Sequence, residues 1–306
     1  LGKGGGAVMT ILLISCNPVV APYPVYPLGM AVIAAALQRA GHTVRQFDLL
    51  ANGFSLDALR AAVAAETPAL IGVSFRNLDN VNACNEALYI DQLTRLIAAL
   101  RTMGDAPVVV GGPGFSVLPE QVLAATGADY GIVGEGEGLI VELAGALARG
   151  GRPAQRILRA PSTLAADEMP PPAYDRRILS FYQQAGGLAP LQTKRGCPFH
   201  CVYCTYPSLE GRTLRLRPLD EVLDDISYLK MTYPDAMLYF TDSVFNDPSH
   251  HYQDILRGML ERDLTMPWTG FITPFGVNGD DLDLTRIDQL LLRPGAQHYQ
   301  PYERRF

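Results

Sequence analysis

The stretch Cys197-Pro-Phe-His-Cys201-Val-Tyr-Cys204 carries three cysteines at the spacing CxxxCxxC. An iron–sulfur cluster held by thiolates usually takes four cysteines, one for each iron. Three thiolates from one short loop therefore leave one iron without a protein ligand, open to the nitrogen and oxygen of a small molecule. The preceding residues suit such a site, because Gly196 allows a sharp backbone turn and the positive charges of Lys194 and Arg195 favour thiolate over thiol.

A zinc site with His200 as a fourth ligand is the alternative for this loop. Zinc sites of the finger type combine pairs of ligands at spacings such as C-x₂₋₄-C and H-x₃₋₅-H. The CxxxCxxC run fits this pattern poorly, and the sequence has no second cysteine or histidine pair at a suitable distance. The spacing therefore favours a cluster over zinc or plain thiols.

The loop resembles the cluster loop of the radical S-adenosylmethionine (SAM) enzymes. The resemblance implies that Cys197, Cys201 and Cys204 hold a 4Fe–4S cluster, and that its fourth iron chelates SAM for cleavage to a 5′-deoxyadenosyl radical. It also implies that Tyr203 lies near the adenine and that Asp242, at the end of a predicted strand, contacts the SAM amino group. A helix-capping or turn carboxylate is the alternative for Asp242.

The composition indicates a folded protein with room for two domains. Of the 306 residues, 48% are hydrophobic and 18% are charged, and the formal net charge of −6 argues against nucleic acid as the main partner. The sequence has no run of 18 apolar residues, so we expect no membrane span. Three of the five cysteines are clustered while Cys16 and Cys84 stand alone, a pattern typical of a reducing cytoplasm.

Residues 9–150, starting at Met9 as the expected native start, alternate short apolar runs with helical segments. This alternation predicts an α/β fold with a flavodoxin- or Rossmann-like doubly wound parallel sheet. The predicted strands are 10–15, 43–49, 70–75, 107–110 and 130–133. The predicted helices are 28–40, 56–65, 85–103, 119–126 and one that follows residues 134–137 and runs through 147.

The loops after these strands supply candidate ligand-binding residues, because doubly wound sheets bind ligands at the carboxyl ends of their strands. Glycines there let the backbone approach a flat or bulky ligand closely, although any flavodoxin-like domain has such glycines. No GxGxxG follows the first strand, so the pattern is not that of a nicotinamide site. The candidates are Ser15, Asn17, Ser74, Gly111, Gly112, Gly134 and Glu135.

A domain of this kind directly before a radical SAM loop resembles the cobalamin-binding radical SAM subfamily, and the turns at 110–113 and 133–137 look like that subfamily's turns. The resemblance implies cobalamin, held by the seven candidates. The DxHxxG motif that supplies an axial histidine in other cobalamin proteins is absent. We expect His42 at the surface, so the resemblance implies no protein imidazole on the lower axial face. A domain that has lost the cofactor is the alternative.

Residues 151–187 lack clear periodicity and contain Pro170-Pro171-Pro172, which predicts a linker between two domains. Residues 188–306 predict the amino-terminal part of a radical SAM partial (β/α) barrel. Its predicted strands are 188–193, 236–240 and 267–272, and its predicted helices are 219–233, 250–263 and 282–292.

Two features of this second domain need explanation. Arg215 and Arg217 resemble basic residues that follow the cluster loop in the cobalamin subfamily, and a solvated basic strand face is the alternative. The residues from 188 onward are too few for a six-unit barrel, because one strand–helix unit takes about 30 residues. We therefore expect a frameshift or truncation near residues 293–300.

The domain order resembles that of cobalamin-dependent radical SAM methyltransferases, which implies methyl transfer to an unactivated carbon. The alternatives are a cobalamin-dependent cyclase or rearrangement enzyme, a truncated non-catalytic remnant, and a flavodoxin-like electron carrier. The resemblance implies a reducing electron donor such as flavodoxin or ferredoxin. A small-molecule, lipid, peptide or tetrapyrrole substrate remains open, because nothing in the sequence names it.

Overall fold

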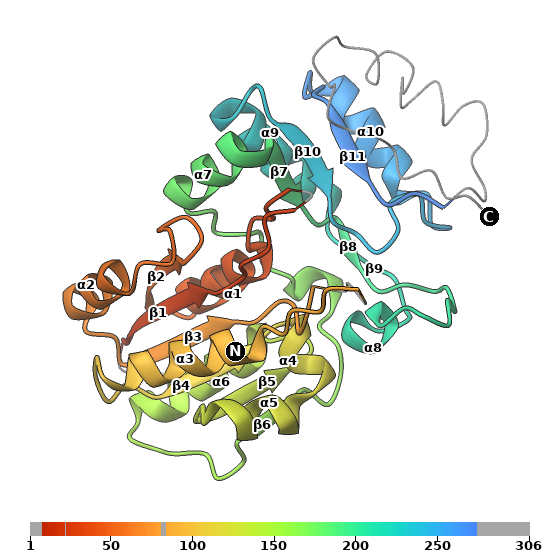
Figure 1. The fold of residues 1–306 in the computed structure, drawn as a ribbon. Coiled ribbons are helices and arrows are strands. Elements are labelled where there is room, and N and C mark those ends of the chain that lie inside the picture. The colour runs from red at the N-terminus through yellow and green to blue at the C-terminus, as the bar shows by residue number, and fades with distance from the viewer. Residues whose placement is uncertain (1–7, 22, 81–83, 274–306) are drawn as a thin grey trace.

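The computed structural model describes residues 8–21, 23–80 and 84–273. Its first part is a six-stranded parallel sheet with the strand order β2-β1-β3-β4-β5-β6 (Figure 1). The strands are β1 (Thr10–Ser15), β2 (Thr43–Asp48), β3 (Leu70–Ser74), β4 (Val108–Gly111), β5 (Tyr130–Val133) and β6 (Ile157–Arg159). This arrangement confirms the α/β fold with a parallel sheet that the alternating pattern predicts.

Helices cover both faces of this sheet, which is why its central strands are almost continuous apolar runs. Ile11 and Leu13 of β1 pack in one core cluster with α1 and α6. Leu12 and Ile14 point to the other face and pack with α2, α3 and α5. The helices are α1 (Leu28–Arg39), α2 (Leu56–Glu66), α3 (Ile90–Arg101), α4 (Pro113–Val117), α5 (Pro119–Thr126) and α6 (Glu137–Ala148).

A second, three-stranded parallel sheet follows in the order β11-β10-β7, as expected for the first strands of a barrel. The core cluster around α1 and α6 continues into this part, because it also contains side chains of α7, β7, α9 and β10. The elements are α7 (Arg176–Gly186), β7 (Leu188–Leu191), α9 (Leu219–Thr232), β10 (Met237–Phe240), α10 (His251–Glu261) and β11 (Trp268–Gly270). The two sheets therefore share one hydrophobic core.

A short antiparallel hairpin lies between β7 and α9, and the sequence analysis missed it. Its strands are β8 (Lys194–Arg195) and β9 (Arg215–Leu216), with α8 (Tyr206–Glu210) between them. Two-residue strands are too short to show alternating hydrophobicity. The hairpin brackets the loop that carries the three clustered cysteines (Figure 1).

The predicted linker 151–187 contains regular structure that its lack of periodicity did not reveal, including a short 3₁₀ helix at Ala166–Glu168. Residues 157–159 form β6, the edge strand of the first sheet, and α7 begins at 176. Asp175 caps α7 by accepting hydrogen bonds from the backbone N–H groups of Arg177 and Ile178, and Tyr182 donates to Asp48 at the end of β2. The helix thus has a clear start signal, which the triple proline before it obscured.

The helix predicted for 85–103 begins five residues later, at Ile90. The residues before it pair with a neighbouring segment instead, since Asn80 and Ala87 exchange hydrogen bonds through the Asn80 backbone and side chain. Local hydrogen bonds of this kind compete with the first turn of a helix.

Two expectations lie outside the described residues: the helix at 282–292 and the frameshift or truncation near 293–300. Within the described ranges, no helix combines the length and the apolar character needed to cross a membrane. His42 is half-buried at the amino end of β2, where its Nδ1 accepts from the Met9 N–H at 3.3 Å, and burial lowers its pKa.

Gly131 in β5 faces the ring of Phe115, and a Cβ at this position would lie 1.9 Å from Phe115 Cζ. Because Phe115 is fully buried, the ring must shift into occupied space. We expect Gly131→Ala to lower the free energy of unfolding by about 1–3 kcal/mol, measured by urea denaturation. Gly138→Ala, on the exposed start of α6 where nothing lies within 4 Å, is the control, and equal midpoints for the two variants would contradict the prediction.

Candidate functional site

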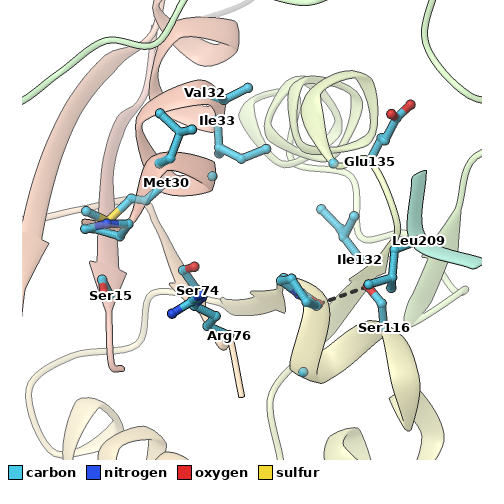
Figure 2. A pocket seen from close by; sticks show the side chains of 18 of the residues that line it. Ser15, Met30, Val32, Ile33, Ser74, Arg76, Ser116, Ile132, Glu135 and Leu209 are labelled. Carbon is cyan, nitrogen blue, oxygen red and sulfur yellow. Dashed lines mark hydrogen bonds between the residues drawn. The ribbon is translucent and has the colours of Figure 1, made fainter. Parts of the chain in front are cut away.

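A cavity of about 750 Å³ opens where β1, β3, β4 and β5 end. The strand order changes direction between β1 and β3, which is where doubly wound sheets bind their ligands. Met30, Val32 and Ile33 of α1 lie on one side of the cavity, and Ile132 and Leu209 on the other (Figure 2). The cavity has the size of a small-molecule or cofactor site.

All seven candidates from the strand-end loops line this cavity. They are Ser15, Asn17, Ser74, Gly111, Gly112, Gly134 and Glu135. Residues from the second part of the chain complete the lining, and the sequence analysis missed them because nothing in their spacing relates them to the strand ends. They are Gln192, Arg195, Thr205, Tyr206, Leu209, Glu210, Tyr239 and Thr241.

The backbone of two loops is held tightly at the cavity wall. Gly112 has φ +102°, and a Cβ there would lie 2.8 Å from the Phe75 carbonyl oxygen, so the position requires glycine. Ser116 joins the loops after β4 and β5, because its hydroxyl donates to the Gly112 carbonyl and accepts from the Gly134 N–H, both at 2.9 Å. Ser116 is near these loops in Figure 2. Ser116 therefore holds the two loops at a fixed position relative to each other.

The lining fits a large, flat ligand with polar groups at its edge. Glycine backbone and apolar side chains offer a smooth surface, and the buried amide Nδ2 of Asn17 lacks a hydrogen-bond acceptor among the described residues. Arg76, after β3, adds an exposed guanidinium at the opening. A corrin ring with its peripheral amides matches these features. Among the described residues no histidine lines the cavity. His42, the histidine of the first domain, directly precedes the amino end of β2, away from the strand ends that form the cavity.

The cysteine loop is anchored by the hairpin. Gly196 has φ +91°, and a Cβ there would lie 2.1 Å from the Thr213 carbonyl oxygen, so only glycine fits. The Cys197 N–H donates to the Gly211 carbonyl at 3.1 Å. Cys197 is buried, Cys204 is half-buried and Cys201 is exposed. Three free thiols on one anchored turn suit a cluster, in which each thiolate binds its own iron.

The zinc alternative finds no support in this loop. Within the described ranges, no three His, Cys, Asp or Glu side chains are placed to hold one metal ion, and His200 is exposed. A single zinc requires its ligands within about 2.0–2.3 Å of one point. Tyr203 is 76% exposed and does not line the cavity, so its place near an adenine stays a prediction.

The expectation that Lys194 favours the cysteine thiolates is wrong, because its charge is neutralised elsewhere. Lys194 is 1% exposed, and its ammonium lies 3.2 Å from Asp242 and 2.9 Å from Asp247. It also donates to the Phe245 carbonyl at 2.8 Å. Burial alone would raise the pKa of Asp247, but the Lys194 charge together with hydrogen bonds from Ser249 and Lys194 holds that pKa below its ordinary value.

Asp242 is fully buried, and its carboxylate already accepts several hydrogen bonds. The donors are the Thr193 N–H at 2.7 Å, the Thr193 hydroxyl at 2.6 Å and the Lys194 ammonium. These contacts tie the end of β10 to the start of the cysteine loop. A contact between Asp242 and SAM stays a prediction, while the geometry assigns this carboxylate a structural role.

Arg195 also points away from the thiols. Its guanidinium lies 3.3 Å from Glu135 and 2.6 Å from Glu137, so it faces the loop after β5. Arg215 contacts Glu135, and Arg217 contacts Asp225 at 2.8 Å. Both arginines are at least nine-tenths buried, so the alternative of a solvated basic strand face is wrong.

Glu210 lines the cavity beside the cysteine loop. It accepts from the Gln192 amide at 3.1 Å, the Gly196 N–H at 3.4 Å and the Ser243 hydroxyl at 3.3 Å. Burial raises its pKa, against the opposing charge of Arg195. The sequence analysis missed this carboxylate, because a single glutamate in a short helix carries no signal.

Comparison with known proteins identifies the first part of the chain. A family model described as "B12 binding domain" matches residues 15–144. A tryptophan 2-C-methyltransferase from Streptomyces laurentii is 30% identical, over 84% of this chain and 53% of its own length. The chain spans about half the length of this relative and of a methyltransferase from Pyrococcus horikoshii that it also matches.

Solved structures resemble the chain beyond that domain. The radical SAM methyltransferase TsrM from Kitasatospora setae, solved with cobalamin and a [4Fe–4S] cluster bound, has a TM-score of 0.78 and 27% identity. The match covers 91% of this chain and 58% of that one. The cobalamin-dependent radical SAM enzyme OxsB, at a TM-score of 0.68 and 17% identity, covers 85% of this chain and 38% of its own and shares the fold.

Proposed function

We propose that this chain, a homologue of the cobalamin-dependent radical SAM methyltransferases with a B12-binding domain, holds cobalamin in the cavity and a 4Fe–4S cluster on its three clustered cysteines. The two cofactors would serve the transfer of a methyl group to carbon. The observation that carries the proposal is that the strand-end loops and the residues beside the cysteine loop line one cavity. Two cofactors that act on one carbon must meet in a shared space.

When bound, cobalamin would supply a methyl group for transfer, and the cluster with SAM would supply one-electron chemistry. The chain's own residues would bind the two cofactors and shield the corrin from water. Gly112 and Gly134 let the backbone approach the corrin, and Met30 and Ile33 of α1 cover it with apolar surface that excludes water. Asn17 would donate its unpaired amide to an acceptor at the edge of the corrin. Cys197, Cys201 and Cys204 hold the cluster.

The proposal assigns residues 9–150 to cobalamin and residues 188–306 to the radical SAM unit, with 151–187 connecting them. An electron for this chemistry would come from a reducing protein such as flavodoxin or ferredoxin, and the free thiols are consistent with a reducing cytoplasm as the location. Methyl transfer is preferred over cyclisation or rearrangement because relatives that match most of the chain are named as methyltransferases. The substrate would enter at the side of Arg76 and Tyr206.

Anaerobic purification and reconstitution of the full chain test the proposal. We expect about four iron and four sulfide per chain, and corrinoid absorbance after titration with hydroxocobalamin. Addition of SAM and dithionite should then yield 5′-deoxyadenosine or S-adenosylhomocysteine. Flavin absorbance in place of corrinoid bands, or a chain that takes up neither iron nor corrinoid, would contradict it.

A cavity variant separates the two cofactors. Ser74→Leu adds bulk at the end of β3, where Ser74 lines the cavity (Figure 2). We expect it to weaken hydroxocobalamin binding by at least about tenfold, because displaced contacts of about 1.4 kcal/mol suffice for that factor. Iron content should remain that of the parent chain. Ser162→Leu, at an exposed position outside the cavity lining, is the control and should bind cobalamin normally.

A further inference from the structure

Two arginines beside the cysteine loop form buried ion pairs with two glutamates of the B12-binding domain. Arg195 contacts both Glu135 and Glu137. Arg215 forms a bidentate ion pair with Glu135, with nitrogen–oxygen distances of 2.7 and 2.8 Å. Arg215 also donates to the Leu164 carbonyl at 2.8 Å, and Glu135 accepts from the Leu164 N–H at 2.8 Å. We call Arg195, Arg215, Glu135 and Glu137 the arginine–glutamate junction.

The junction is shielded from water. The exposed fractions of its side chains are 10% for each arginine, 6% for Glu135 and 7% for Glu137. Burial alone would raise the pKa of Glu135, but the hydrogen bond from Arg215 and the charge of Arg195 hold it below its ordinary value. Burial would lower the pKa of Arg195, and the charge and hydrogen bond of Glu137 raise it instead. Both directions favour the charged forms of Glu135 and Arg195.

Buried ion pairs of this kind contribute little net stability, because desolvation offsets their attraction. Their geometry is strict, however, and removal of one member leaves an uncompensated charge. An apolar contact would hold the two parts together equally well. The ion pairs instead fix one register between the loop at 134–137 and the hairpin β8–β9.

The junction connects the two proposed cofactor sites along a short path. Glu135 belongs to the loop after β5 and Glu137 is the first residue of α6, and both line the cavity. Arg195 is followed by Gly196 and then by Cys197, the first cysteine of the motif. A ligand that holds residues 134–137 in place therefore also holds the base of the cysteine loop in place, through the ion pairs of the junction.

We infer that the arginine–glutamate junction couples the two sites, so that cluster assembly raises the affinity for cobalamin and cobalamin raises the retention of the cluster. The inference rests on the proposed function and adds a positioning role for these four residues. A ligand that holds one side of the junction in its binding position also positions the other side, so the second ligand binds a site that is already in place. Linkage requires the effect to be equal in both directions.

The test is the dissociation constant of hydroxocobalamin, measured by anaerobic absorbance titration on the full chain with and without its cluster. For the parent chain we expect binding to be at least about fivefold tighter with the cluster present, the lower end of typical coupling. Arg215→Gln should bring this ratio close to one, although Arg215 does not line the cavity. Glu137→Gln, from the other side of the junction, should do the same.

Two further variants separate positioning from folding. Arg215→Lys keeps the charge and one contact, and should retain part of the ratio. Arg159→Gln removes an exposed ion pair with Glu120 and should leave the ratio unchanged. The electron paramagnetic resonance spectrum of the reduced cluster is a second readout: it should respond to cobalamin in the parent chain and not in Arg215→Gln.

The outcomes distinguish this inference from the proposed function. A parent chain that binds both cofactors with a ratio near one overturns the coupling and leaves the proposed function standing. An Arg215→Gln chain that folds and keeps the parent ratio also overturns it. A parent chain that binds neither cofactor refutes the proposed function and the coupling together.

Discussion

Asp242→Asn is expected to lower the free energy of unfolding by about 3–5 kcal/mol, as is usual when one partner of a buried ion pair is removed. The carboxylate is fully buried and faces the Lys194 ammonium at 3.2 Å. Both carboxylate oxygens of Asp242 accept hydrogen bonds. In either orientation, the NH₂ group of an asparagine would therefore face another donor, from Thr193 or from the Lys194 ammonium. Asp247, the second carboxylate on Lys194, would be left as its only counter-charge among the described residues.

Urea denaturation measures this effect, with Asp254→Asn as the matched control. Asp254 forms an exposed i,i+3 pair with Arg257 and should cost less than about 1 kcal/mol. The experiment also separates the two roles considered for Asp242. A variant of unchanged stability that has lost SAM binding would refute the structural role and favour a direct SAM contact.

Cys201→Ala is expected to remove the cluster, so that iron and sulfide in the reconstituted chain fall to a small fraction of the parent values. Two thiolates cannot replace three on a cluster that already lacks a fourth protein ligand. Cys201 is exposed, so its replacement should leave the urea midpoint of the cluster-free chain unchanged. Hydroxocobalamin binding to the cluster-free chain should also be unchanged, because Cys201 does not line the cavity.

Cys84→Ala is the control for this experiment, since Cys84 is exposed and lies outside the motif. It should keep the full iron and sulfide content and the brown colour. A Cys201→Ala chain that keeps both would refute the cluster assignment and reopen the question of what the three cysteines do. Loss of iron from both variants would indicate a general effect of thiol removal.

The sequence was sufficient for features that depend on neighbours along the chain. The apolar run of β1 and the helix of α5 have the bounds that periodicity predicts. The seven strand-end candidates line one cavity because parallel strands deliver their carboxyl ends to one edge of a sheet. Gly196 is a glycine for the reason expected, a backbone turn that no side chain permits.

Contacts between distant residues could not be predicted in this way. Lys194 and Arg195 precede the cysteines in sequence, yet their charges are taken by carboxylates from other elements. Lys194 and Asp242 are 48 residues apart, and Arg215 and Glu135 are 80 apart. Sequence spacing carries no information on which carboxylate reaches which cation, because the choice depends on how the two sheets pack.

Local order along the chain thus specified the strands, their loops and the cysteine turn, because backbone geometry and hydrophobic period act over a few residues. Packing of the second sheet against α1 and α7 brought the barrel-side residues to the cavity and buried the arginines against glutamates. Burial is a property of the assembled core, so the charges that the linear sequence assigns to the thiols pair with carboxylates instead: Lys194 with Asp242 and Asp247, and Arg195 with Glu135 and Glu137.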